Sequence, residues 1–175
     1  MGLLNSIIRN FSSDSIKIPN ELALLIMIMS ESTADEFVDN HSDIDINSIN
    51  ISGVKQKVAL DLICFYIYVA TLGLGRNSKT NSPLILNNLI EACSVKYSIK
   101  YFSTTNKNIT SKYESIICAR VKKYIELQSP ESVVDDYIYK TLISVVLNPT
   151  KSFACKINLI NQTSSFLGHI EEKYS

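Results

Sequence analysis

The sequence lacks most of the features from which an enzymatic function is usually predicted. Its two histidines, His41 and His169, form no H-E-x-x-H or similar pair, so a metallohydrolase centre has few ligands available. It has neither a G-x-S-x-G motif nor a cysteine in a polar, positive setting. Seventeen basic residues balance seventeen acidic ones, so the chain as a whole has no electrostatic bias toward nucleic acid or anionic membranes. These absences favour a binding protein without metal or cofactor over an enzyme.

Cysteine usage and hydropathy both indicate a cytoplasmic location. The cysteines are far apart, lie among apolar neighbours and form no C-x-x-C pair, so we expect buried, reduced thiols. The first residues lack the basic region of a signal peptide. The longest apolar run, 62–74, is shorter than the ~20 residues that cross a bilayer, and Lys57 and Asp61 precede it. No membrane span is therefore expected. The four cysteines are Cys64, Cys93, Cys118 and Cys155.

The spacing of apolar residues predicts the fold class. Apolar residues recur every three or four positions almost throughout, and the five glycines and four prolines fall mainly between such segments. We therefore expect an all-α, single-domain bundle over residues 1–175, with about six main helices plus a short N-terminal helix. Gly2 followed by Ser6 fits the N-myristoylation pattern, and a plain helix start is the alternative. The short first helix would carry Leu3, Leu4, Ile7, Ile8 and Phe11 on one face.

Local signals give the expected helix boundaries in the first part of the chain. Pro19 and Asn20 are expected to open the second helix, in which residues 22–29 are apolar on all sides and predict a central, buried element. Thr33 and Glu36 have the spacing of a capping box, which would continue or restart this helix. The polar stretch 40–52 then predicts a short strand or an extended loop.

The second part of the chain shows further start and stop signals. A helix over 53–72 is expected to end at Gly73 and Gly75, and Pro83 to precede a helix over 84–102. Ser111 and Glu114 form a second apparent capping box. The remaining signals are Ser129, Pro130 and Glu131 at the start of a helix that runs to Leu147, and Thr150 at the start of the last helix.

Two segments resemble ligand-binding loops but depart from the required patterns. The stretch 73–80 differs from a Walker A phosphate loop at Ser78, where that loop needs glycine, and Pro83 interrupts the helix that should follow. The acidic stretch 39–47 resembles a cation site in its many oxygen-bearing side chains, and an EF-hand would be counted from Asp43. An EF-hand there would need glycine and glutamate where the chain has Ser48 and Val54. Neither segment supports a nucleotide or metal site.

Charged residues are unevenly distributed along the chain. Residues 18–54 contain no lysine or arginine, whereas residues 96–123 contain seven basic residues and one acid, Glu114. The two blocks either face each other and cancel within the fold, or form separate surfaces. The acidic block contains Glu21, Glu31, Asp35, Glu36, Asp39, Asp43 and Asp45, and the basic block contains Lys96, Lys100, Lys107, Lys112, Arg120, Lys122 and Lys123.

If the acidic block faces outward, it predicts a docking surface for a basic partner protein. Clustered carboxylates attract a cationic partner and speed its association, which suits an inhibitor of a nucleic-acid-cleaving protein. In composition the chain is similar in general character to bacterial immunity proteins that neutralise nuclease toxins, although no motif carries this likeness. The predicted partner-binding residues are Glu31, Asp35, Glu36, Asp39, Asp43 and Asp45.

The basic block offers an alternative function. Lysines interspersed with aromatic residues are typical of proteins that bind single-stranded nucleic acid through phosphate contacts and base stacking. Tyr113 and Tyr124, however, fall on the apolar stripe of their helix, where we expect core residues. An enzyme whose site is assembled from distant residues is the third possibility. The aromatic residues in question are Tyr97, Tyr101, Phe102, Tyr113 and Tyr124.

Overall fold

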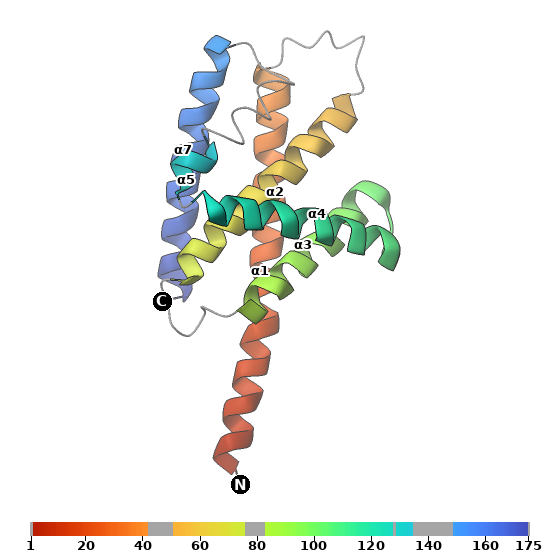
Figure 1. Cartoon of the computed structure of the whole chain (residues 1–175), viewed down its shortest axis with the longest axis vertical. Coiled ribbons are helices and arrows are strands. Elements are labelled where there is room, and N and C mark those ends of the chain that lie inside the picture. Colours follow the sequence, from red (N-terminus) through yellow and green to blue (C-terminus); the bar gives the residue numbers. More distant parts are fainter. Residues whose placement is uncertain (1, 42–50, 76–82, 128, 135–148, 175) are drawn as a thin grey trace.

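The computed structural model describes residues 2–41, 51–75, 83–127, 129–134 and 149–174. Within these ranges every regular element is a helix, which confirms the predicted all-α fold class. The last long helix, α7, begins at Pro149, so Thr150 lies inside it and is not its cap as expected. The helices are α1 (Gly2–His41), α2 (Ile51–Gly75), α3 (Pro83–Phe102), α4 (Lys107–Glu126), α5 (Pro130–Val133) and α7 (Pro149–Tyr174) (Figure 1).

The centre of the bundle is α2, which contacts α1, α3, α4 and α7. Residues 58–70 of α2 are buried without interruption. The expectation that 22–29 would be the central element is therefore wrong, because Leu24 and Ile28 of α1 lie at the surface. The segment Gly53–Gly75 has the length and mean hydropathy (1.9) of a membrane span, and 83% of its most apolar window is buried inside the bundle. A buried core helix shares these properties, so the absence of a membrane span stays a prediction.

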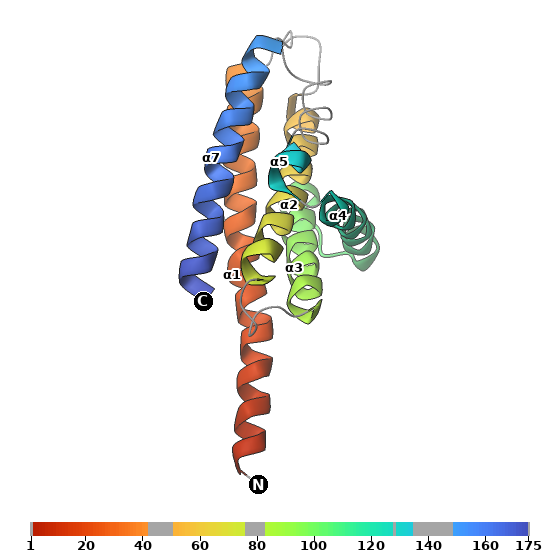
Figure 2. The same cartoon turned by 60° about the vertical axis from the view of Figure 1, so that its left-hand side comes forward.

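The helix α1 continues through Pro19 instead of starting there. Pro19 is buried beside α3, so tertiary packing outweighs the local preference of proline for a helix start. Thr33 is likewise not a cap. Thr33 lies within α1, and its buried side chain donates a hydrogen bond to Gln162 Oε1 of α7 (3.0 Å). The same Gln162 oxygen also accepts a hydrogen bond from the Tyr66 hydroxyl of α2 (2.9 Å). These bonds join three helices. The N-terminal end of α1 extends beyond the other helices (Figures 1 and 2).

The turn between α3 and α4 is fixed by backbone and side-chain hydrogen bonds. Ser103 has a positive φ of 52°, and its amide donates to Ile99 O (3.0 Å), the 5→1 bond of an αL cap, while the Thr104 amide donates to Ser98 O (3.4 Å). Asn106 Oδ1 then caps α4 by accepting from the Asn108 amide (2.9 Å). The predicted capping box at Ser111 and Glu114 is therefore wrong, because both residues lie inside α4.

The two glycines expected to end α2 have different roles. Gly75 is the last residue of the helix, as predicted, but Gly73 lies within it. A Cβ atom at Gly73 would lie 2.7 Å from Ile170 Cγ2 and 3.2 Å from Leu167 Cδ1, so glycine allows α7 to approach α2 closely here. The start of α5 is as predicted, since Ser129 Oγ accepts from the Ser132 amide (3.1 Å).

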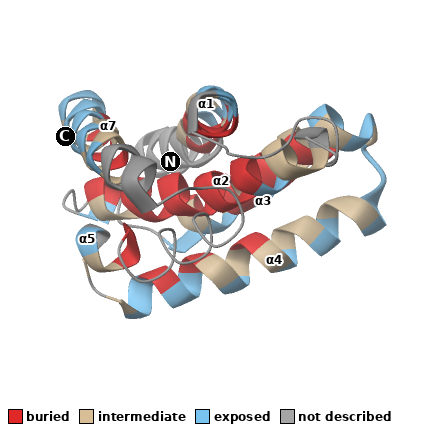
Figure 3. Cartoon of the chain, turned by 90° about the horizontal axis from the view of Figure 1, so that it is seen from above, coloured by how far each residue is buried: buried red, intermediate tan, exposed pale blue. Residues whose placement is uncertain are grey.

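Seen along its length, the bundle places α1 and α4 on opposite sides (Figure 3). The helices α2 and α3 lie between them, and each contacts both α1 and α4. Asp61 of α2 is 2% exposed and forms an ion pair with Arg120 of α4 inside the α2–α4 interface. Arg120, 25% exposed, is therefore engaged at the α2–α4 interface through Asp61.

Candidate functional site

The predicted acidic site lies on the C-terminal half of α1, where the structure describes four of its six residues. Glu31, Asp35 and Asp39 recur at four-residue spacing and so share one face of the helix. Glu36 lies nearer α7, where its Oε1 accepts a hydrogen bond from Asn158 Nδ2 (3.4 Å). Asp43 and Asp45 lie outside the described residues.

Lysines from neighbouring helices partly neutralise these carboxylates. Lys55 of α2 contacts both Asp35 (3.1 Å) and Asp39 (2.9 Å), and Lys100 of α3 contacts Glu31 (3.2 Å). The two hydrogen-bonded aspartates raise the pKa of Lys55. The side chains of Asp35 and Asp39 nevertheless remain 61% and 59% exposed. Four carboxylates against two ammonium groups leave a formal charge of −2 on this surface.

Tyr101 of α3 lies beside the acidic residues of α1. Burial, with the nearby carboxylates of Glu31 and Asp35, raises the pKa of its hydroxyl to about 12. Its ring packs against that of the fully buried Tyr97, with centroids 4.7 Å apart. Tyr101 thus anchors the acidic surface to the aromatic core between α1 and α3.

The structure adds an apolar part of the site that the sequence did not indicate. Leu24 and Ile28 are 54% and 57% exposed on α1. At 100° per residue they lie within 40° of each other around the helix axis and in line with Asp35. The run 22–29 is apolar on all sides, so its sequence contains no period from which the exposed residues could be chosen. Helix α1 therefore presents apolar residues first and acidic residues one to three turns later.

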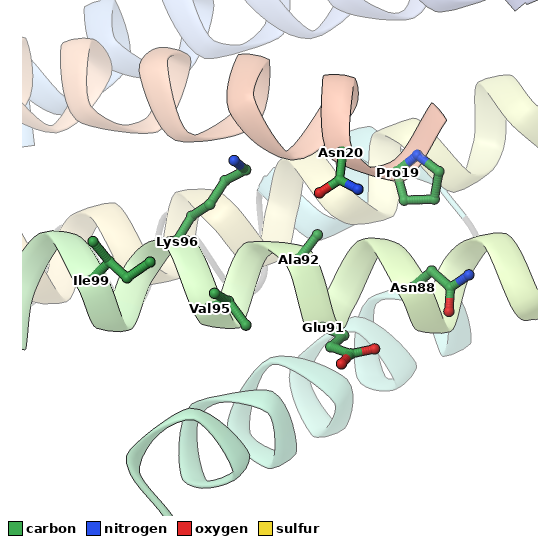
Figure 4. A pocket seen from close by; sticks show the side chains of 8 residues that line it. All are labelled: Pro19, Asn20, Asn88, Glu91, Ala92, Val95, Lys96 and Ile99. Carbon is green, nitrogen blue, oxygen red and sulfur yellow. The ribbon is translucent and has the colours of Figure 1, made fainter. Parts of the chain in front are cut away.

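A shallow groove of about 370 Å³ lies between α1 and α3 (Figure 4). Pro19 and Asn20 form the α1 side, and Lys96 extends from α3 toward α1. Ile99, at one end of the groove, is 49% exposed. The residues that line it on α3 are Asn88, Glu91, Ala92, Val95, Lys96 and Ile99. The lining is therefore mixed, with Pro19, Ala92, Val95 and Ile99 beside Asn20, Asn88, Glu91 and Lys96.

The basic block divides into three parts. Lys96 and Lys100 face α1, and Arg120 is engaged in its buried pair with Asp61. The other four lysines, Lys107, Lys112, Lys122 and Lys123, are exposed on α4. Because α1 and α4 lie on opposite sides of the bundle, the acidic and basic blocks do not face each other as wholes (Figure 3). Among the described residues, Glu31 with Lys100 is the one ion pair between them.

Other candidate chemistry receives little support within the described residues. Cys64, Cys93 and Cys118 are free thiols, and burial raises the pKa of Cys64 and Cys93 well above its usual value, which disfavours the reactive thiolate. The described part of the chain contains no group of three or more His, Cys, Asp or Glu side chains that could hold a metal ion. Most of the two segments that resemble ligand-binding loops, residues 76–80 and 43–50, lies outside the described residues.

Comparisons of this chain with protein-family models, with curated proteins and with solved structures found no match. The function must therefore be argued from the surface itself.

Proposed function

We propose that this protein is a binding module that docks a basic partner protein on the outward face of α1. The observation that carries the proposal is the alignment of Leu24 and Ile28 with Asp35 and Asp39 along one exposed helix face. Protein interfaces commonly combine a buried apolar centre with a polar rim. This face has both parts, since Leu24 and Ile28 supply an apolar centre and the carboxylates lie at one end of it.

The apolar part would supply most of the affinity. Single exposed leucines are common on protein surfaces, but Leu24 and Ile28 lie on successive turns of one helix face and together form a small apolar patch. Burying one such side chain completely contributes about 1.5–3 kcal/mol. Leu24, Ile28 and Ile99 are each about half exposed, so each retains a substantial part of that energy for an interface.

The acidic part would select the partner and speed its association. A formal charge of −2 over Glu31, Asp35, Glu36 and Asp39 favours a cationic surface and disfavours an anionic one. Lys55 holds Asp35 and Asp39 in place and also moderates their charge. The partner would then contact carboxylates whose positions are already fixed, which reduces the entropic cost of binding.

We infer further that the partner is a nuclease-like toxin and that the protein is its inhibitor or immunity protein. A nuclease must carry a positive cleft to bind its substrate, and an acidic, partly apolar helix face is complementary to such a cleft. This role needs no catalysis, cofactor or metal, and it places the protein in the cytoplasm, where a producing cell would need protection.

The test begins with the protein encoded by the neighbouring gene, or with a partner co-purified from the native host. Association is measured by surface plasmon resonance at several salt concentrations. D35N/D39N should lower the on-rate several-fold and flatten its salt dependence. L24A/I28A should raise the off-rate at least tenfold, corresponding to about 1.4 kcal/mol or more.

Matched controls use residues of similar exposure elsewhere. Ile125 of α4 and Ile157 of α7 are 45% and 42% exposed, and I125A/I157A should leave the complex unchanged. E21Q removes an acid near the middle of α1, which pairs with Lys173 of α7 (3.0 Å) and lies outside the Glu31–Asp39 cluster, and should leave the salt dependence unchanged. If the α1 variants bind as the unmodified protein does, this face is not the interface. If the complex forms but the partner has no nuclease activity, the docking proposal stands and the toxin assignment is wrong.

A further inference from the structure

The outward face of α4 is a second charged surface. The helix packs onto the bundle through Ile117, Val121 and Tyr124, all buried. Its one exposed acid is Glu126, at the C-terminal end. Within the described part of the chain, Lys107, Lys112 and Lys122 have no ion-pair partner. The exposed residues from Lys107 to Lys123 are Lys107, Asn108, Ser111, Lys112, Ser115, Ala119, Lys122 and Lys123.

An aromatic pair lies at the end of this face, where α3 turns into α4. Phe102 is 39% exposed and stacks on Tyr113, with ring centroids 5.1 Å apart and an interplanar angle of 25°. Tyr113 packs in turn against the buried Tyr97 (4.8 Å), so the pair is supported from the core. The ammonium group of Lys112 lies 5.8 Å from the centroid of the Tyr113 ring.

The backbone of the turn holds the aromatic pair in position. Ser103, directly after Phe102, has the positive φ that ends α3. Asn106 then caps α4, and its carbonyl oxygen accepts a hydrogen bond from the Thr110 amide (3.0 Å). Phe102 and Tyr113 are therefore brought together by a defined turn between two packed helices. Of the other three aromatic residues that the sequence suggested, Tyr97 and Tyr124 are buried and unavailable for stacking on a base, and Tyr101 packs on Tyr97 near Glu31 and Asp35.

We propose that Phe102 and the lysines of α4 bind single-stranded RNA. The lysines would contact phosphates, and the exposed face of Phe102 would stack on a base. From Lys107 to Lys122 the helix spans about 22 Å, enough for several nucleotides. The face has no exposed arginine for bidentate base contacts, so recognition would tolerate different sequences. This surface lies on the side of the bundle opposite α1 and is independent of the proposed partner-docking face (Figure 3).

The absence of tryptophan from the chain provides a direct reporter. In F102W the new indole is the single tryptophan and keeps the capacity to stack. The probe is a single-stranded RNA of about twelve uridines, added at about 50 mM salt. Binding should quench the tryptophan fluorescence, and the quenching should disappear as salt is raised. In the otherwise unmodified protein, F102L keeps apolar cover without an aromatic ring and should weaken RNA binding about fivefold or more, measured by fluorescence anisotropy.

Lysine variants separate this face from the rest of the surface. K107A/K112A should reduce the slope of log affinity against log salt by about 1.4, since each lost phosphate contact removes about 0.7 for a single strand. The control K17A/K57A removes the same charge from exposed sites on α1 and α2 and should leave the slope unchanged. Circular dichroism confirms that each variant is folded. Absence of RNA binding at low salt, or equal losses in both double variants, would overturn the proposal. Binding to phosphatidylserine vesicles without binding to RNA would also overturn it and identify α4 as a membrane contact.

Discussion

Replacing Arg120 with methionine tests whether the Asp61–Arg120 pair is a structural element of the α2–α4 interface. Methionine keeps much of the side-chain volume but removes the charge that faces Asp61. Asp61 is 2% exposed and cannot turn to water without moving α2, whereas Arg120 is 25% exposed. Removing one partner of a buried pair typically costs about 3–5 kcal/mol, because the other charge stays buried. Asp61 can instead take up a proton, which limits the loss to about 4 kcal/mol at pH 7.

The reciprocal variant should be less damaging. In D61L the remaining charge belongs to Arg120, whose partly exposed guanidinium can reach water, so we expect a loss of about 1–2 kcal/mol. The double variant D61L/R120M places two apolar side chains in the interface and should unfold within about 1 kcal/mol of the unmodified protein. The double variant should therefore be the most stable of the three, D61L the second and R120M the least stable.

The measurement is urea unfolding followed by far-UV circular dichroism at pH 7 and at pH 5. The deficit of R120M should shrink by up to about 1.4 kcal/mol per pH unit as Asp61 becomes protonated. A loss below about 1 kcal/mol in R120M would show that Asp61 has another way to satisfy its charge. If the double variant is as unstable as R120M, lost packing and not an unpaired charge explains the effect.

Backbone geometry, helix packing and burial each allow a further prediction. G73A should destabilise the protein by about 1–2 kcal/mol, because the added Cβ meets the β-branched, buried Ile170. G168A has open space around the added Cβ and should stabilise the protein by about 0.5–1 kcal/mol. Thermal unfolding measures both effects. S103G should raise stability by about 0.5–1 kcal/mol in urea unfolding, since glycine tolerates the positive φ. The pKa of Tyr101 is raised to about 12, so the stability that its protonated hydroxyl contributes is complete below about pH 10 and is lost as pH rises toward 12. The variant Y101F should therefore be less sensitive to alkaline unfolding. Absorbance titration of the tyrosines checks the pKa.

Features that depend on neighbouring residues were predictable from the sequence. Helical periodicity indicated the fold class, and Ser129 caps α5 as its position before Pro130 suggested. Pro83 begins α3 for the same local reason, since the first turn of a helix does not need its amide. These signals involve residues within one turn of each other, and at these two positions, unlike at Pro19 and Thr33, no tertiary contact overrides them.

Features that depend on residues far apart in sequence were not predictable. Asp61 and Arg120 are 59 positions apart, and nothing near either residue marks it as a partner of the other. Pro19 and Thr33 carry correct local signals for helix starts, but contacts with α3 and α7 keep both inside one long helix. The acidic residues can be listed from the sequence, but the lysine that pairs with Asp35 and Asp39 comes from α2 and could not be assigned.

The opposite placement of α1 and α4 makes a last prediction about the two charged faces. Packed helices lie about 8–10 Å apart, so one intervening layer separates α1 from α4 by roughly 16–20 Å, beyond the Debye length at physiological salt. D35N/D39N and K107A/K112A should therefore act independently. Their effects on stability should add within about 0.5 kcal/mol when the four substitutions are combined, measured by urea unfolding. The control is K100A, which removes the pair with Glu31 and should couple to D35N/D39N through the shared acidic surface. A coupling above about 1 kcal/mol between the α1 and α4 variants would mean that the acidic and basic blocks compensate each other within the fold. That result would contradict the proposal that each face is a separate binding surface.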